Sequence, residues 1–295
     1  MNGSLRAAEF AAYLGLAVGL PLMAMAFPPA ALFIGMPLAV LTYRRGFRFA
    51  ALMAIGIGVV VGLLTQPWAG FMYALNLAIG IGIGWAFVAQ WPAARTAAFA
   101  MALGVAAFVL AWVILKGVVG FDPAAALDHF MGTGPQGREL AEREQQVLEW
   151  VRKVQPALGL LGGAAAGFFS TISARALLIR QGADLPALPP FRSWRAPWPL
   201  AWGYILGLGL EMAPKAWFGG SAHVIGYNLD VVFSVLFALI GLAILWYLFD
   251  ELKWGWPRIL AAALLLQLGP VLVWAGLLDS WFDFRTLWER RVKEN

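Results

Sequence analysis

The sequence predicts an all-α fold, a polytopic transmembrane helical bundle with eight or nine spans. Hydrophobic residues make up 61% of the 295 residues. Charged residues make up only 13%, whereas a soluble domain carries about 25%. Apolar stretches of about 20 residues, the length that crosses a bilayer core, recur along almost the whole chain.

Nine apolar segments are candidate spans. They lie at about 7–27, 30–44, 47–65, 68–91, 96–119, 156–179, 198–214, 224–248 and 257–279. The second and the seventh are short. A short segment either accompanies a tilted neighbour, crosses a thinned bilayer or re-enters on one side. We therefore expect eight or nine crossings.

Lysine and arginine in short loops predict the orientation, because cytoplasmic loops are enriched in both. With the N-terminus in the cytoplasm, ten basic residues fall on the cytoplasmic side, and only Lys215 lies in the opposite short loops. The ten are Arg6, Arg44, Arg45, Arg48, Arg95, Arg180, Arg192, Arg195, Lys253 and Arg258. The side of the C-terminal tail stays open, since it depends on whether residues 198–214 cross.

Composition also excludes several functions. The net charge of +5 fits basic loops beside anionic lipid better than nucleic-acid binding. The absence of cysteine excludes disulfides and thiol chemistry, and His129 and His223 are too few for a histidine cluster. We expect no metal, no cofactor and no nucleic-acid partner; the expected partner is the lipid bilayer.

The predicted organisation has three parts. Residues 1–180 form a six-span membrane domain, residues 181–197 form a proline-rich loop, and residues 198–295 form a C-terminal membrane segment with an amphipathic tail. A polar insertion at 120–155 interrupts the first part on the predicted outer side. Within it, Gly137 to Val154 has the spacing of an amphipathic surface helix, a solvated cap or, alternatively, a gate or docking lid.

The loop at 181–197 contains four prolines, which exclude a regular helix. Its aromatic residues and arginines are typical of an anchor at the membrane interface, with the cations toward lipid phosphates. Within the loop these residues are Phe191, Arg192, Trp194 and Arg195, and Trp198 follows directly after it. The alternative is a cytoplasmic elbow that binds a partner.

Glycines recur at helical steps in three spans, a pattern that lets helix backbones approach closely in lipid. They are Gly56, Gly58 and Gly62, then Gly80, Gly82 and Gly84, then Gly159, Gly163 and Gly167. We interpret them as packing faces. The run at 80–84 is not a dinucleotide fingerprint, because no strand precedes it.

Polar groups at membrane depth are the candidate ligand-binding residues, since such groups usually face a cavity or a partner. They are Glu211, Lys215, His223, Asn228, Asp230, Asn76 and Gln267. The alternative is a Glu211–Lys215 helical pair with solvated neighbours. We expect no enzyme and no catalytic residue, because no metalloprotease or nucleophile-elbow motif occurs.

Near the C-terminus stands GLLDSWFDFR, residues 276–285. Asp279 and Asp283 are four residues apart, which suggests acid–base chemistry. At a hydrated helix end, however, a structural cap or local pairing with Arg285 is the favoured interpretation.

Four stretches of the chain form a recognisable set: MPLAVLTYRRGFRFA (36–50), LPPFRSWRAPWPLAW (188–202), NLDVVFSVLFALIGLAILWYLF (228–249) and GLLDSWFDFR (276–285). These stretches resemble the YybS-like family of bacterial membrane proteins, a domain of unknown function. Their order along the chain matches that family. The resemblance implies a multi-pass protein of the bacterial inner (cytoplasmic) membrane and no established catalytic residues.

The N-terminal part is also similar, more distantly, to the six-span substrate-binding S subunits of energy-coupling-factor importers and to the shape-determination protein MreD. The shared features are a short second span after proline, glycine-rich spans and alanines four apart in the first span. In the importers such alanines contact the coupling subunit, and the matching positions are Ala7, Ala8, Ala11 and Ala12. The long insertion and the extra C-terminal spans depart from that pattern.

Two functions follow as hypotheses. The first is a small-solute-binding transport subunit that works with a partner, an energising ATPase module, because the chain has no Walker A motif. The second is a non-transporting scaffold of an envelope or sporulation complex.

Overall fold

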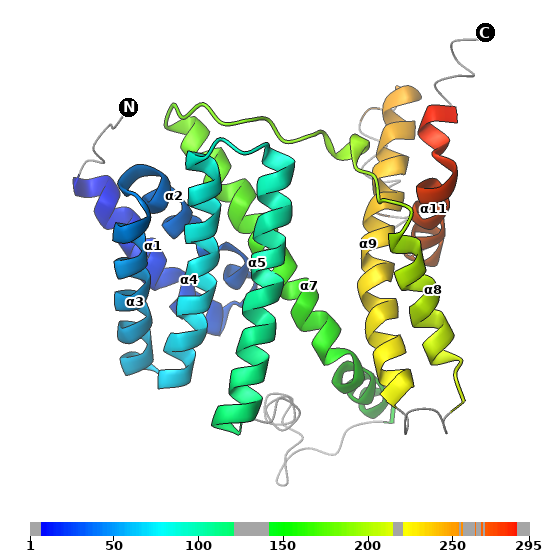
Figure 1. The fold of residues 1–295 in the computed structure, drawn as a ribbon, viewed down its shortest axis with the longest axis horizontal. Coiled ribbons are helices and arrows are strands. Elements are labelled where there is room, and N and C mark those ends of the chain that lie inside the picture. The colour runs from blue at the N-terminus through cyan, green and yellow to red at the C-terminus, as the bar shows by residue number, and fades with distance from the viewer. Residues whose placement is uncertain are drawn as a thin grey trace. The chain divides into compact units, whose positions relative to one another are not determined.

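The computed structural model describes residues 7–120, 142–214, 221–253, 255, 263, 267 and 269–287. Within these residues every regular element is helical (Figure 1), which confirms the predicted all-α class. The chain divides into two compact units. Unit 1 comprises Met1–Leu140 and Gly159–Leu188, and unit 2 comprises Ala141–Leu158 and Pro189–Asn295.

Unit 1 is a helical bundle built around α4. Its elements are α1 (Ala7–Ala26), η1 (Pro28–Phe33), α2 (Gly35–Arg45), α3 (Phe47–Leu64), α4 (Pro67–Val88), α5 (Ala93–Ile114), the π-helical turn η2 (Leu115–Val119) and the later part of α7 (Glu142–Arg180). Helix α4 packs against α2, α3 and α5. Leu38, Val61, Leu77 and Ile83 are fully buried in the core that these helices share.

The ends of these helices follow from local sequence. Gly46, between α2 and α3, has a φ of 89°, and Gly182, after α7, has a φ of 80°. Only glycine adopts such backbone angles without strain. Pro67 is the first residue of α4, where its missing N–H costs no helical hydrogen bond. Glycine and proline thus set the reversals that stack the helices.

Close helix packing occurs where the glycine pattern predicts it. A Cβ atom added to Gly80 would lie 2.0 Å from the carbonyl oxygen of Gly35, and one added to Gly163 would lie 2.4 Å from that of Gly104. Neither position has room for a larger residue. Gly56 differs, because a Cβ there would meet nothing within 4 Å. The packing interpretation is confirmed at Gly80 and Gly163, but not at Gly56.

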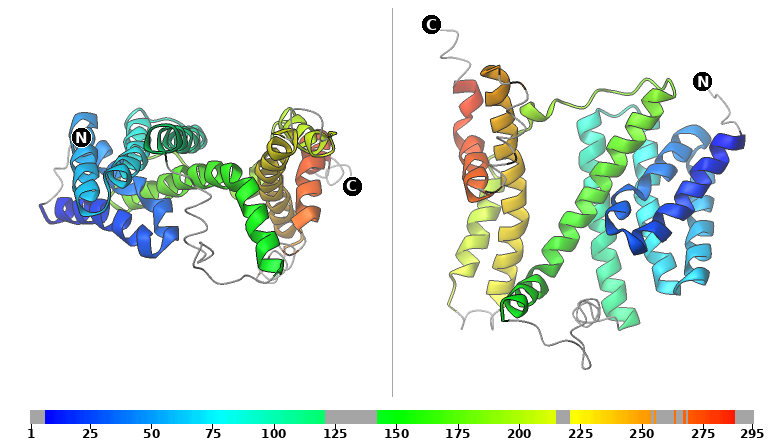
Figure 2. Two further views of the ribbon diagram at one scale, coloured as in Figure 1. Left: turned by 90° about the horizontal axis from the view of Figure 1, so that it is seen from below. Right: turned by 180° about the vertical axis from the view of Figure 1, so that it is seen from behind.

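Unit 2 is built around α9. It contains residues 142–158 of α7, η3 (Phe191–Ser193), α8 (Leu200–Glu211), α9 (Ser221–Glu251) and α11 (Gly269–Phe282). Helix α9 packs against both α8 and α11, as the two views of Figure 2 show. Phe237 on α9 is fully buried together with Ala201 of α8. A Cβ on Gly276 of α11 would lie 2.0 Å from the Phe237 carbonyl oxygen, so α9 and α11 nearly touch.

Helix α7 corrects one prediction. We expected a surface helix that ends at Val154 and a separate span that begins at residue 156. Instead a single helix of 39 residues runs through Pro156. The first residues of the expected surface helix, 137–141, lie outside the described residues. The loop that follows α7 contains only the short turn η3 before α8, as its four prolines predict.

Five described helices are long and apolar enough to cross a membrane. They are α3, α4, Ala93–Val119, residues Gln145–Arg180 of α7, and α9. Apolar parts of α1 and α8 are shorter, and α2 and α11 have 11 and 14 residues, fewer than the roughly 20 that a bilayer core requires. The helices identify a multi-pass membrane protein; the number of eight or nine spans stays a prediction.

Candidate functional site

Helices α8 and α9 cross with almost no gap at two glycines. A Cβ atom added to Gly207 would lie 2.9 Å from the backbone nitrogen of Asp230, and one added to Gly226 would lie 2.7 Å from that of Glu211. This close crossing places Glu211, the last residue of α8, beside the first turns of α9. The small residues therefore serve to bring polar side chains of the two helices together.

Three of the predicted ligand-binding residues gather at this crossing: Glu211, His223 and Asp230, here called the α8–α9 polar cluster. Asp230 and His223 are both close enough to Glu211 to interact with its charge. The Glu211 Oε1 and His223 Nε2 atoms are buried, and neither has a hydrogen-bond partner among the described residues. Buried polar atoms are normally paired, because an unpaired one costs about 1–3 kcal/mol. The cluster thus has unused capacity to accept or donate hydrogen bonds.

Asp230 connects this cluster to the interior of unit 2. Its carboxylate accepts a hydrogen bond of 3.2 Å from the Ser234 hydroxyl, one turn along α9. The buried ring of Tyr204, on α8, lies close to both residues. Two carboxylates and an imidazole in partly buried surroundings favour a cationic ligand that donates hydrogen bonds, or an exchangeable proton.

Asn228 has a different environment, although it lies only two residues from Asp230. Its amide group donates to the carbonyl of Lys153 at 2.8 Å and accepts from the backbone N–H of Ala157 at 2.8 Å. In a regular helix those two backbone groups bond to each other. Pro156 disturbs α7 at this point because it lacks an N–H and its ring crowds the preceding turn. The Asn228 side chain therefore forms hydrogen bonds with both backbone groups that the disturbed turn leaves unpaired.

This bridge supplies a physical reason why α7 continues past Pro156. The amide also donates to the carbonyl of Val224 at 2.7 Å, so its hydrogen-bonding groups are engaged on both helices. The sequence showed the proline and the asparagine separately. Nothing in their spacing, 72 residues apart, indicates that they meet.

The other predicted binding residues lie elsewhere. Asn76 belongs to unit 1, and its amide donates to the Met72 carbonyl at 3.0 Å. Gln267 is exposed just before α11, and Lys215 lies outside the described residues. On α1, Ala11 and Ala12 are exposed, whereas the side chains of Ala7 and Ala8 lie outside the described part. The role of each of these residues in binding stays a prediction.

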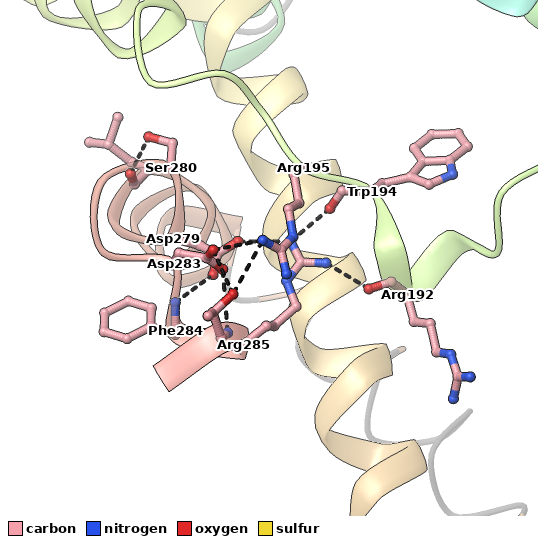
Figure 3. Close-up of polar contacts among 10 residues, drawn as sticks. Arg192, Trp194, Arg195, Asp279, Ser280, Asp283, Phe284 and Arg285 are labelled. Carbon is pink, nitrogen blue, oxygen red and sulfur yellow. Dashed lines mark hydrogen bonds and ion pairs between the residues drawn. The ribbon is translucent and has the colours of Figure 1, made fainter. Parts of the chain in front are cut away.

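The acid–aromatic–base stretch near the C-terminus forms a buried anchor, which we call the C-terminal clasp (Figure 3). Arg285 pairs with Asp279 at 2.7 Å, and each side chain is only 2% exposed. The same guanidinium donates to the backbone carbonyls of Arg192 at 2.6 Å and Trp194 at 2.7 Å. One buried cation thus fixes the proline-rich loop to the end of α11.

Two exposed ion pairs surround this centre. Arg195 contacts Asp283 at 2.7 Å, and Arg192 contacts Asp250 of α9 at 3.2 Å. Burial opposes ionisation of Asp283, but hydrogen bonds from Thr286 and the Arg195 charge outweigh it and lower the pKa of Asp283 below its ordinary value. The guanidinium groups of the two loop arginines contact carboxylates of the same unit, and both side chains stay about half exposed. Their predicted role as a membrane-interface anchor stays a prediction.

The clasp has the chemistry of a structural element. Asp279 also accepts the backbone N–H of Phe284 at 3.1 Å, so it caps the end of α11 while it pairs with Arg285. The predicted cap and local Asp–Arg pairing are confirmed. Among the described residues, no group of three or more His, Cys, Asp or Glu side chains has the arrangement of a metal site.

Residues 10–280 match the family model described as "Predicted membrane protein (DUF2232)". The chain belongs to this family of predicted membrane proteins. The match covers helices of both units and the polar cluster; it includes Asp279 of the clasp but ends before Asp283 and Arg285. The YybS-like resemblance is consistent with it. No curated protein and no solved structure matches the chain. The distant likeness to importer S subunits and to MreD stays a prediction.

Proposed function

We propose that this protein is a membrane transport subunit that binds a small solute bearing a cationic, hydrogen-donating group. Glu211, His223 and Asp230 are its central binding residues. The observation that supports this most is the pair of buried, unpartnered atoms in the α8–α9 polar cluster, Glu211 Oε1 and His223 Nε2. A bound donor would remove the cost of leaving them unpaired.

The chemistry of the cluster selects the class of solute. An ionised carboxylate only accepts hydrogen bonds, and two of them repel each other until a cation lies between them. A primary amine or ammonium group supplies both the charge and the donors. The Nε2 atom of His223 can accept or donate a hydrogen bond, according to the tautomer of the ring. We propose no catalytic step.

Transport against a gradient requires an energy source. These 295 residues contain no Walker A motif, so they do not supply an ATPase themselves. We propose a membrane-protein partner or ATPase module that docks on α1, where Ala11 and Ala12 are exposed. A Cβ atom added to Gly15 or Gly19 of the same helix would meet nothing within 4 Å. Small exposed residues let a second helix approach closely in lipid.

The same face of α1 favours the alternative function, a scaffold of an envelope or sporulation complex. A scaffold needs a protein-binding face and no solute. In both functions we propose eight or nine crossings of the bacterial inner membrane, with the short helices α2, α8 and α11 crossing or re-entering.

A thermal-shift experiment tests solute binding. The purified protein is heated with ammonium or putrescine, which carry N–H donors, or with choline, a cation whose nitrogen carries none, and its apparent melting temperature is recorded. A ligand at about 100 times its dissociation constant stabilises the folded state by about 2.7 kcal/mol. We expect a shift with at least one amine-bearing cation, and its loss in Glu211→Gln.

The matched control is Asp184→Asn, which removes one exposed carboxylate of unit 1. We expect this variant to keep the shift. If every cation leaves the wild-type melting temperature unchanged, or if Glu211→Gln keeps the full shift, the cluster does not bind a cationic solute. The scaffold function then becomes the better proposal.

A further inference from the structure

Unit 1 gathers arginines at one end of its bundle. Helix α2 ends and α3 begins there, α4 ends and α5 begins there, and α7 ends there, as Figure 1 shows for this unit. The arginines at these helix ends are Arg44, Arg45, Arg48, Arg95, Arg175 and Arg180. Within unit 1, the described residues at the opposite end of these helices include a single cation, Lys116 in η2.

Hydrogen bonds tie these helix ends to the segment after α7. Arg44 donates to both the backbone and the side-chain oxygen of Gln181 at 3.3 Å. The Gln90 amide, from the turn between α4 and α5, reaches the Asp184 carbonyl at 3.4 Å. Arg175 donates to the Pro186 carbonyl at 2.9 Å. These hydrogen bonds hold the basic helix ends together, so the arginines belong to one continuous surface of unit 1.

Four of the arginines are exposed on this surface: Arg45, Arg48, Arg95 and Arg180, here called the arginine rim. In the described part of the chain no carboxylate lies within ion-pair distance of Arg48 or Arg180. The acidic residues described at this end are Glu9 and Asp184, so cations outnumber anions. Such an excess favours an anionic partner.

Aromatic side chains lie beside the rim. The Arg95 guanidinium stacks over the ring of Trp91, 4.2 Å from its centroid. Trp91 in turn packs edge-on against Trp85 at 5.1 Å and Phe99 at 5.4 Å. Tryptophan with neighbouring arginine is typical of the headgroup level of a membrane. Helices α3, α4, α5 and α7, which end or begin here, are among those long enough to span.

We propose that the arginine rim binds the phosphate groups of anionic phospholipids. The excess of cations supplies the charge complementarity, the aromatic group sets the depth, and the spanning helices hold the rim at the surface where lipid phosphates lie. This proposal concerns unit 1 and does not depend on the solute site of unit 2. Its partner is the lipid headgroup, not free phosphate.

Native mass spectrometry of the full chain from mixed detergent–lipid micelles tests the rim. The probes are phosphatidylglycerol, which is anionic, and phosphatidylcholine of the same acyl chains, which is not. We expect preferential retention of phosphatidylglycerol. Because each basic side chain near an anionic surface strengthens binding about fivefold, replacing Arg48, Arg95 and Arg180 by Gln should weaken retention at least tenfold.

Two further variants and one competitor make the test decisive. Replacing the same three arginines by Lys keeps the charge and should keep most of the preference, and Lys116→Gln at the opposite end should leave it unchanged. The effect of charge should also fall with added salt. Equal retention of the two lipids by the wild type, or an unchanged preference in the Gln variant, would overturn the proposal. Displacement of the lipid by millimolar inorganic phosphate would assign the rim to free phosphate instead.

Discussion

Replacing Arg285 by Met should release the proline-rich loop from α11 and destabilise unit 2. The variant removes a guanidinium that is 2% exposed, and leaves the Asp279 carboxylate, also 2% exposed, without its ionic partner. The Arg192 and Trp194 carbonyls also lose their donor. Removal of one member of a buried ion pair typically costs about 3–5 kcal/mol, because the remaining charge stays buried. We expect a loss of unfolding free energy of about this size.

The assay is unfolding by a denaturing detergent, followed by the fluorescence of tryptophans, of which the loop contains Trp194. The control is Arg195→Gln, which breaks an ion pair whose side chains are 47% and 45% exposed. Exposed pairs contribute less than about 1 kcal/mol, so this variant should unfold nearly like the wild type. A second variant, Arg285→Met with Asp279→Leu, removes both charges and should recover much of the loss.

The result that would refute this reasoning is an Arg285→Met protein no less stable than Arg195→Gln. The buried pair would then be replaceable by solvent, and the clasp would not anchor the loop.

Three further predictions concern other parts of the chain. Asn228→Ala should lower the free energy of unfolding by about 1–3 kcal/mol, because it leaves two backbone groups of α7 unpaired. Hydrogen exchange near residues 153–157 should accelerate. Adding Pro156→Ala to this variant should suppress most of the loss, since the two backbone groups can then bond to each other. Acidification should loosen the loop, because the pKa of Asp283 is lower in the folded protein than its unfolded-state value of about 3.9. The ionised Asp283 therefore stabilises the fold above that value, and this stabilisation is lost as the pH falls through the lower folded-state pKa. The fluorescence of the loop tryptophan should change below about pH 4, and it should change less in Asp283→Asn. Gly80→Ala should reduce the melting temperature strongly, since its Cβ would lie 2.0 Å from a backbone oxygen, whereas Gly56→Ala meets open space and should be neutral or stabilising.

The sequence predicted the features that depend on composition and local spacing. Apolar runs indicated membrane helices, and four prolines excluded a helix from the loop after α7. Asp279, Asp283 and Arg285 are close neighbours in the chain, so their pairing at a helix end could be inferred without knowledge of the fold. These predictions succeeded because each physical cause lies within a few residues.

Features that depend on contacts between distant residues could not be predicted. Pro156 indicated the end of a helix by local rules, but Asn228 of another helix supports the disturbed turn, and α7 continues. Similarly, the ion pairs of Arg192 with Asp250 and of Arg195 with Asp283 could not be predicted, because the partners lie 58 and 88 residues apart in the chain.

The α8–α9 polar cluster is an intermediate case. Its residues were candidates because charged groups are rare at membrane depth. The close helix crossing at Gly207 and Gly226 was not predicted, and it is seen only in the structure. Only the structure shows which of the candidates meet: His223 and Asp230 approach Glu211, whereas Asn228 bonds to α7.

Native mass spectrometry of the protein, extracted gently from its own membranes, tests the solute-binding function most directly. We predict a reproducible small-molecule adduct on the wild type and on Asp184→Asn, lost when Glu211 and Asp230 are replaced by Gln and Asn. The adduct mass would give the identity of the solute. A wild-type protein that carries no adduct but retains stable protein partners would contradict the transport function and support the scaffold.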